Sequence, residues 1–233
     1  MKSAKGKVES VKGKVESVKG KVERYFFNNS SCLIFMKIQN NITGIILAGG
    51  KSSRIGTDKA LLKFQSKTFI QIIYDNLKEL CSEIIISSNN PEVKISGVKI
   101  VADKIKNIGP AGGIFSALSV SETEKNIIVS VDTPFIPATL FEFLIKHNTD
   151  DTDVLIISEG TKLHPLIGIY SKNFKHILSE EIKKGNYKIR DIIKKTHYKI
   201  TDISEERFYR KNILQNINTK DDYNSALERK RSI

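Results

Sequence analysis

The stretch LAGGKSSRIGTDKALL, residues 47–62, places a glycine pair and several charged side chains directly after an apolar segment. Gly49 and Gly50 allow the backbone to approach an anion closely, and consecutive N–H groups there can form a concave site for phosphate oxygens. Arg54 offers a planar, forked cation and Lys59 a compact one. These residues predict a loop that binds the phosphates of a nucleotide. An ordinary strand-to-helix turn with solvated charges is the less favoured interpretation.

Two familiar phosphate motifs are absent from this loop. A Walker A loop needs Gly-Lys-Ser/Thr, whereas Gly56 is followed by Thr57 and Asp58, and the fingerprint G-x-G-x-x-G does not occur either. The four histidines have no metal-ligand spacing, and no strained elbow carries a nucleophilic serine. The loop must therefore bind its anion by a different scheme.

Two aspartates follow other apolar segments and extend the predicted site. Asp132 comes directly after residues 127–131, and Mg²⁺ favours oxygen ligands and bridges phosphates, so Asp132 is predicted to bind magnesium. Considered alone, Asp132 fits a turn or a helix N-cap better than a metal site, and the glycine loop is what favours the metal. Asp103 precedes the sequence GPAGG at 109–113, which is either a hinge or a surface for close approach of a ligand, leading into a helix N-terminus that favours negative charge.

Apolar and amphipathic segments alternate along the chain and must position these groups. We expect strands over residues 42–48, 83–87, 98–102, 126–131, 153–158, 165–171 and 213–217. We expect helices over residues 69–80, 112–120, 138–147, 173–184, 189–195 and 221–230. The strands are continuously apolar, which predicts an α/β fold with a mostly parallel central sheet and helices on both faces. Ligands of such sheets bind beyond the carboxyl ends of the strands, where Asp103, Asp132 and Asn218 would meet the glycine loop.

The composition excludes several classes of protein. The 233 residues include 38 Lys and Arg against 26 Asp and Glu, a net charge of +12. No stretch approaches the roughly 20 consecutive apolar residues of a membrane span, and the N-terminus does not resemble a secretory signal. The two cysteines, Cys32 and Cys81, lack metal-ligand spacing and favour a reducing, cytoplasmic setting. The lysines are dispersed and no nucleic-acid-binding motif is visible, so we expect neither nucleic acid nor membrane as a partner.

The N-terminal segment differs from the rest of the chain. Residues 5–25 contain KGKVESV twice and then KGKVERY, and the glycine in each unit costs a helix about 1 kcal/mol. Residues 2–24 contribute eight Lys or Arg and three Glu, which is +5 of the net charge. We interpret residues 1–35 as a disordered tail or as a spurious extension, because Met36 stands just before the first strand. Residues 36–233 are expected to form one domain.

The motifs together resemble one enzyme family. LAGG…RIGTDKALL, Asp103, GPAGGI, VDTPFIP, His164-Pro165 and NINT at 216–219 resemble the molybdenum cofactor guanylyltransferase family of the MobA type, in order from about Ile42 to the C-terminal segment. The first motif alone is shared by many sugar-nucleotide and cytidylyl transferases. The combination of RIGTDK, DTPFIP and NINT is more specific.

The resemblance implies a Rossmann-like nucleotidyltransferase fold over residues 36–233. It implies that the chain transfers GMP from GTP to the phosphate of molybdenum-molybdopterin, with Mg²⁺ as cofactor and release of pyrophosphate. GTP and molybdenum-molybdopterin would be its partners, with other cofactor-biosynthesis proteins as a further class.

The resemblance also implies roles for single residues. Nucleotide-binding positions would be Leu47, Ala48, Gly49, Lys59, Asp103 and Asp132. Asp132 would also bind the metal, and Lys59 and Arg54 would act in catalysis by stabilising charge on the leaving pyrophosphate. Ser87 stands where the family has a nucleotide-contacting Asn, with Asn89 nearby, so guanine over cytosine rests on overall similarity. A related cytidylyl- or uridylyltransferase acting on another phosphorylated substrate is the alternative.

Overall fold

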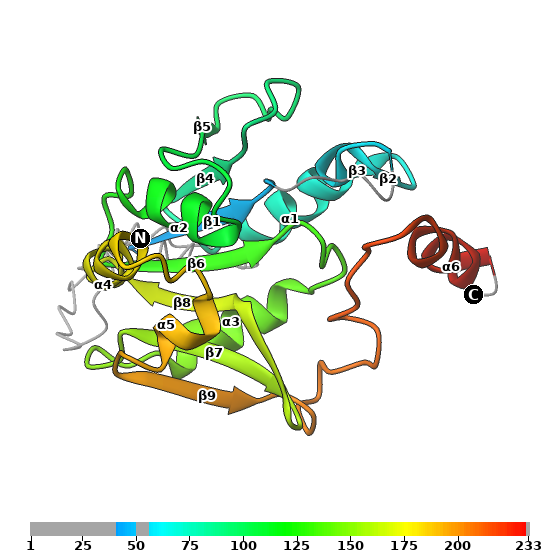
Figure 1. Cartoon of the computed structure of the whole chain (residues 1–233). Coiled ribbons are helices and arrows are strands. Elements are labelled where there is room, and N and C mark those ends of the chain that lie inside the picture. Colours follow the sequence, from blue (N-terminus) through cyan, green and yellow to red (C-terminus); the bar gives the residue numbers. More distant parts are fainter. Residues whose placement is uncertain (1–40, 50–55, 232–233) are drawn as a thin grey trace, which may run out of the picture.

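A computed structural model describes residues 41–49 and 56–231, and its centre is a β-sheet. In the described part of the chain the sheet has seven strands in the order β5-β4-β1-β6-β8-β7-β9 (Figure 1). The strands are β1 (Ile42–Leu47), β4 (Glu83–Ser87), β5 (Lys99–Val101), β6 (Lys125–Ser130), β7 (Val154–Glu159), β8 (Lys162–Ser171) and β9 (Tyr198–Asp202).

The direction of the strands confirms the prediction of a mostly parallel sheet. β1 pairs in parallel with β4 and β6, β4 with β5, and β7 with β9. β8 runs antiparallel to both of its neighbours, β6 and β7. The expected fold class, an α/β sheet covered by helices, is therefore correct.

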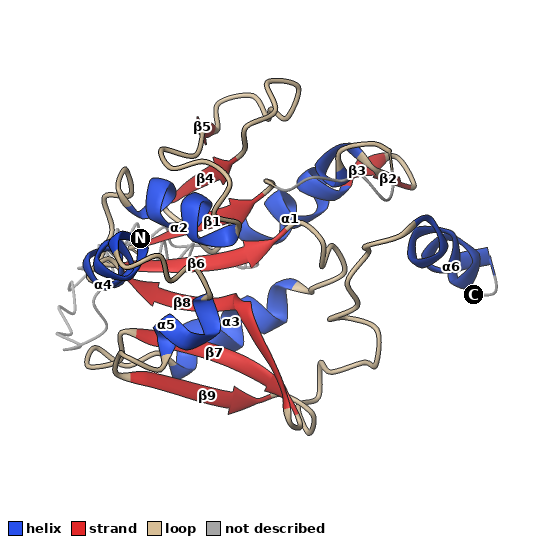
Figure 2. Ribbon diagram, in the orientation of Figure 1, coloured by secondary structure: helices blue, strands red, loops and turns tan. Residues whose placement is uncertain are grey.

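Helices cover both faces of the sheet, as predicted (Figure 2). The helices are α1 (Phe69–Leu77), α2 (Pro110–Leu118), α3 (Ala138–His147), α4 (Phe174–Lys183), α5 (Ile189–Ile193) and α6 (Lys220–Arg231). Buried side chains of α1 and α3 pack with Ile46 of β1 in one core, and those of α2, α4 and α5 pack with Ile45 in the other. Because successive strand residues enter opposite cores, the strands are apolar without alternation.

The predicted strand over residues 213–217 is wrong. Ile213, Leu214 and Ile217 are buried, but the segment consists of turns and irregular chain. Its backbone bonds locally at Ile213, and the N–H of Ile217 donates to the carbonyl of Asp132 at 2.8 Å. A run of apolar residues indicates that a segment is buried, but not that it is a strand. A buried loop whose backbone groups have hydrogen-bond partners can have the same apolar sequence.

Two strand features were not predicted. β9 is an edge strand with Tyr198 43% and Ile200 40% exposed, so its sequence lacks the apolar pattern of the other strands. The short hairpin of β2 (Lys63–Phe64) and β3 (Lys67–Thr68) offers too few residues to show a period. In the described residues no helix is long and apolar enough to cross a membrane.

The C-terminal helix α6 packs beside this hairpin, to the right of the sheet in Figure 1. The hydroxyl of Tyr223 donates to the carbonyl of Lys63 at 2.6 Å, and its ring lies 6.1 Å from that of Phe69, centroid to centroid. The end of the described chain is thereby joined to the segment that follows β1.

Candidate nucleotide-binding site

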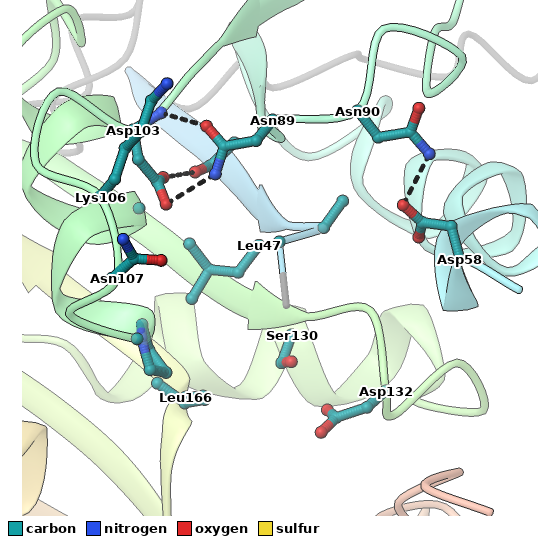
Figure 3. Close-up of a pocket in the computed structure, with 16 residues that line it drawn as sticks. Leu47, Asp58, Asn89, Asn90, Asp103, Lys106, Asn107, Ser130, Asp132 and Leu166 are labelled. Carbon is teal, nitrogen blue, oxygen red and sulfur yellow. Dashed lines mark hydrogen bonds between the residues drawn. The ribbon is translucent and has the colours of Figure 1, made fainter. Parts of the chain in front are cut away.

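Four neighbouring strands end at one level and form the floor of a pocket. The register places Leu47 beside both Ser87 and Ser130, and Ser87 beside Val101. A pocket of about 840 Å³ opens above these ends, as expected for a parallel sheet. It is lined by Leu47, Ala48, Gly49, Asp58, Ser87, Asn89, Asn90, Asp103, Lys106, Asn107, Gly109, Pro110, Gly113, Ser130, Asp132 and Leu166 (Figure 3).

Each of the four strands contributes a lining residue two positions beyond its end. These residues are Gly49 after β1, Asn89 after β4, Asp103 after β5 and Asp132 after β6. The level strand ends bring together residues that are up to 83 positions apart in the sequence. In Figure 3 the carboxylates of Asp103 and Asp132 lie on opposite sides, with Leu47 between them.

Asn89 holds the carboxylate of Asp103 in a fixed orientation. Its side-chain Nδ2 donates to Asp103 Oδ2 at 2.9 Å, and its Oδ1 accepts from the backbone N–H of Asp103, also at 2.9 Å. The hydroxyl of Ser87 donates to Asp103 Oδ1 over a longer 3.5 Å. The carboxylate thus presents two positioned acceptor oxygens at one end of the pocket.

The glycines of GPAGG allow close approach between parts of the protein itself. α2 begins at Pro110, two residues earlier than expected, after Gly109 with a positive φ of 64°. A Cβ on Gly113 would lie 2.7 Å from Ser87 Oγ, and one on Gly112 would lie 2.5 Å from the carbonyl oxygen of Ile105. The two glycines therefore allow the first turn of α2 to pack against the end of β4 and the loop that follows Asp103.

The opposite end of the pocket is formed by the segment around Lys59. Asp58 caps the short 3-10 helix η1 (Lys59–Leu61) by accepting from the N–H of Ala60 at 2.9 Å, and it accepts from Asn90 Nδ2 at 2.8 Å. Asp58 lines the pocket, whereas Lys59 is not among the lining residues. The ammonium of Lys59 instead donates to Asn218 Oδ1 at 2.5 Å.

Asp132 and Lys59 lie on the same edge of the sheet, because consecutive residues of the C-terminal segment contact both. Ile217 donates its N–H to the carbonyl of Asp132, and Asn218 accepts from Lys59. The expectation that Asn218 would reach this edge is met, although the predicted strand before it does not exist.

Comparison with known proteins identifies the family. The model of the MobA-like NTP transferase domain matches residues 44–200. The chain belongs to the MobA-like NTP transferase family. It is accordingly a nucleotidyltransferase.

Relatives of this MobA-like transferase agree with the assignment. A protein of Carboxydothermus hydrogenoformans named "Probable molybdenum cofactor guanylyltransferase" is 35% identical over 190 residues, which cover 81% of this chain and 96% of that protein. A protein of the same name from Flavobacterium johnsoniae is 37% identical over 151 residues, covering 65% and 80%. The structure of molybdopterin-guanine dinucleotide biosynthesis protein A from Archaeoglobus fulgidus superposes with a TM-score of 0.69 at 22% identity, covering 82% and 100%, and supports the fold.

The donor groups of the MobA-like transferase suit a divalent metal ion that is held jointly by protein and phosphate oxygens. In the described residues no group of three or more His, Cys, Asp or Glu side chains could hold a metal by itself. Mg²⁺ typically uses only one or two carboxylates and completes its shell with phosphate oxygens and water. Asp132, which lies near Ser130 in Figure 3, offers one such carboxylate.

Some of the site residues predicted from the sequence line the pocket, and others lie outside the residues that the structure describes. Leu47, Ala48, Gly49, Asp103 and Asp132 line the pocket. Arg54, Gly50 and the interpretation of residues 1–35 lie outside the described residues. Several residues were given no chemical role from the sequence, among them Asn89, which contacts Asp103, Asn218, which contacts Lys59, and the lining residues Lys106 and Asn107. Asn89 and Asn218 carried a sequence signal, since each belongs to a polar stretch noted near the site, whereas Lys106 and Asn107 carried none.

Proposed function

We propose that this MobA-like transferase moves GMP from GTP to the phosphate of molybdenum-bound molybdopterin and releases pyrophosphate. The Asn89–Asp103 arrangement at one end of the pocket is the observation that carries the choice of nucleotide. The names of relatives at 35% and 37% identity support the choice of reaction.

The carboxylate of Asp103 suits a guanine base. Guanine presents two adjacent donors, N1–H and the 2-amino group, which a carboxylate with two oriented oxygens can accept. Cytosine presents one donor, its 4-amino group, beside acceptors at N3 and O2, so it can satisfy at most one of the two oxygens and leaves the other facing an acceptor. Ser87 stands where the family has an asparagine. Because Asn89 orients Asp103 here, the carboxylate that would accept from the base is still in place.

At the other end of the pocket, the chemistry requires charge neutralisation. An oxygen of the acceptor phosphate attacks the α-phosphorus, the bond to the oxygen between the α- and β-phosphorus atoms breaks, and pyrophosphate leaves with that electron pair. Anion approaches anion, so positioning and electrostatic stabilisation supply most of the rate. We assign the triphosphate to the main chain of Leu47, Ala48 and Gly49, and stabilisation of the leaving pyrophosphate to Lys59 and Arg54.

Magnesium has a defined place in this proposal. Asp132 would hold the ion together with the phosphates, and the bound ion would neutralise charge on the phosphate oxygens. No covalent intermediate with the protein is required. The reaction is assigned to the cytoplasm; Cys81, a free and buried thiol, suits a reducing compartment.

Two measurements test the proposal. The melting temperature is measured with GTP, CTP or UTP in the presence of Mg²⁺, since a ligand that binds the folded state raises it. GTP is expected to give the largest shift, and pyrophosphate release from GTP should depend on added molybdenum-molybdopterin. A larger shift with CTP or UTP would favour a cytidylyl- or uridylyltransferase and reject the guanylyl assignment.

A further inference from the structure

The segment of residues 217–223 contacts two candidate site residues from outside the region that the family model matches. That region ends at residue 200. Beyond it, the N–H of Ile217 donates to the carbonyl of Asp132 at 2.8 Å, and Asn218 Oδ1 accepts from Lys59 Nζ at 2.5 Å. A short stretch of chain thereby joins the loop after β6 to the 3-10 helix η1.

Asp222 determines the shape of this stretch. Its Oδ2 accepts from the backbone N–H of Asn218 at 2.9 Å and from that of Thr219 at 2.8 Å. The hydroxyl of Thr219 accepts in return from the N–H of Asp222 at 3.1 Å, as in a helix capping box. The hydrogen bond from Asn218 and, to a lesser degree, the charge of Lys59 lower the pKa of Asp222. The carboxylate is therefore ionised at neutral pH and restrains the backbone N–H groups of both Asn218 and Thr219.

The helix that carries Asp222 is itself anchored. Tyr223 bonds to the carbonyl of Lys63 and packs against Phe69, so the first turn of α6 is attached to the hairpin and to α1. Lys59 begins the 3-10 helix that leads into the same hairpin. The anchored helix and the restrained turn leave Asn218 little freedom to move relative to Lys59.

We propose that Asp222 is a positioning residue: it fixes the backbone of Asn218, whose carboxamide holds the ammonium of Lys59 in place for the phosphates of the nucleotide. A lysine side chain has more rotational freedom to lose than most others, so ordering it before the nucleotide arrives favours binding. This inference rests on the proposed nucleotide transfer and extends it to a residue that touches no substrate.

A double-mutant cycle tests the inference. Affinities of GTP with Mg²⁺, and of inorganic tripolyphosphate as a probe without a base, are measured by calorimetry for the wild type, Asp222→Ala, Lys59→Ala and the double variant. We expect Asp222→Ala to weaken both ligands about tenfold and Lys59→Ala by about tenfold or more. The double variant should bind within about twofold of Lys59→Ala alone, because Asp222 acts through Lys59.

Asp221→Ala is the matched control. Asp221 is an exposed carboxylate in the same first turn of α6, one position from Asp222. Its replacement changes the charge of the helix equally and should leave both affinities within about twofold of the wild type.

Several outcomes decide the question. Additive losses in the double variant would indicate a general effect of α6 and overturn the inference. Unchanged affinity in Asp222→Ala would overturn it too, as would tighter binding, which would mean that Asn218 holds Lys59 away from the phosphates.

Should Asp222→Ala fail to fold, Asn218→Ala removes the acceptor without touching the helix cap, and the same non-additivity with Lys59→Ala is expected. A wild type that binds tripolyphosphate but does not prefer GTP would reject the proposed function and leave the inference standing, whereas one that binds neither would reject both.

Discussion

The replacement Asp103→Asn tests whether this carboxylate reads the base. It conserves size but replaces one acceptor oxygen with an NH₂ donor. Asn89 Nδ2 lies 2.9 Å from Asp103 Oδ2 and needs an oxygen there, so the carbonyl of the new amide should point toward Asn89. The NH₂ then takes the place of Oδ1, 3.5 Å from the hydroxyl of Ser87, which can accept. The fold should therefore be unaffected.

The magnitude follows from the hydrogen bonds lost. A guanine donor that met a charged oxygen now meets an NH₂ group, and a hydrogen bond to a charged group contributes about 1.5–3 kcal/mol. This corresponds to a roughly 10- to 100-fold weaker affinity for GTP. CTP makes no use of two acceptors at this position, so its affinity should change by less than about threefold. The ratio of GTP to CTP affinity should fall almost as far as the affinity for GTP itself.

The assay is titration calorimetry of both nucleotides in the presence of Mg²⁺. Asp132→Asn is the matched control, because it makes the same chemical change across the pocket, where the phosphates are assigned. It should weaken GTP and CTP equally and leave their ratio unchanged. An unchanged ratio in Asp103→Asn, or an equal change of the ratio in Asp132→Asn, would refute the assignment of Asp103 to the base.

Four other substitutions have defined outcomes. Lys59→Ala and Asp132→Ala should each reduce turnover by about 10²–10³ with an unchanged far-UV spectrum, because they remove charge stabilisation at the phosphates; wild-type turnover in a variant would exclude that residue from the mechanism. Gly112→Ala gains up to about 1 kcal/mol of helix propensity, but its Cβ would lie 2.5 Å from the backbone oxygen of Ile105. We therefore expect the free energy of unfolding, measured in urea, to fall by about 1–3 kcal/mol. A stabilised variant would contradict the close packing. Hydrogen bonding from Asn218 lowers the pKa of Asp222 in the folded state. The ionised carboxylate therefore stabilises the fold above the unfolded pKa of about 4, and this stabilisation is lost as the pH falls through the lower folded value. Asp222→Asn should be less stable than the wild type in urea at pH 7 and equally stable at low pH, whereas a difference that does not depend on pH would show that the charge has no part.

Much of the fold could be predicted because burial leaves a pattern in sequence. Strands buried on both faces, such as β1 and β6, are continuous apolar runs, and helices such as α1 repeat apolar residues at helical spacing. Residues 213–217 produced the same signal without a strand, and the exposed edge strand β9 produced none. Apolar pattern therefore predicted burial well and hydrogen-bond pairing less well.

The sequence by itself determined three of the four residues that line the pocket two positions beyond a strand end, Gly49, Asp103 and Asp132, because parallel strands end at one edge of the sheet. Only the tertiary structure decided which side chains orient them. Asn89 meets Asp103 across two neighbouring strands, and Asn218 meets Lys59 across 159 residues of chain. Such contacts depend on register and on the path of an irregular segment, and neither has a period that composition or spacing can reveal.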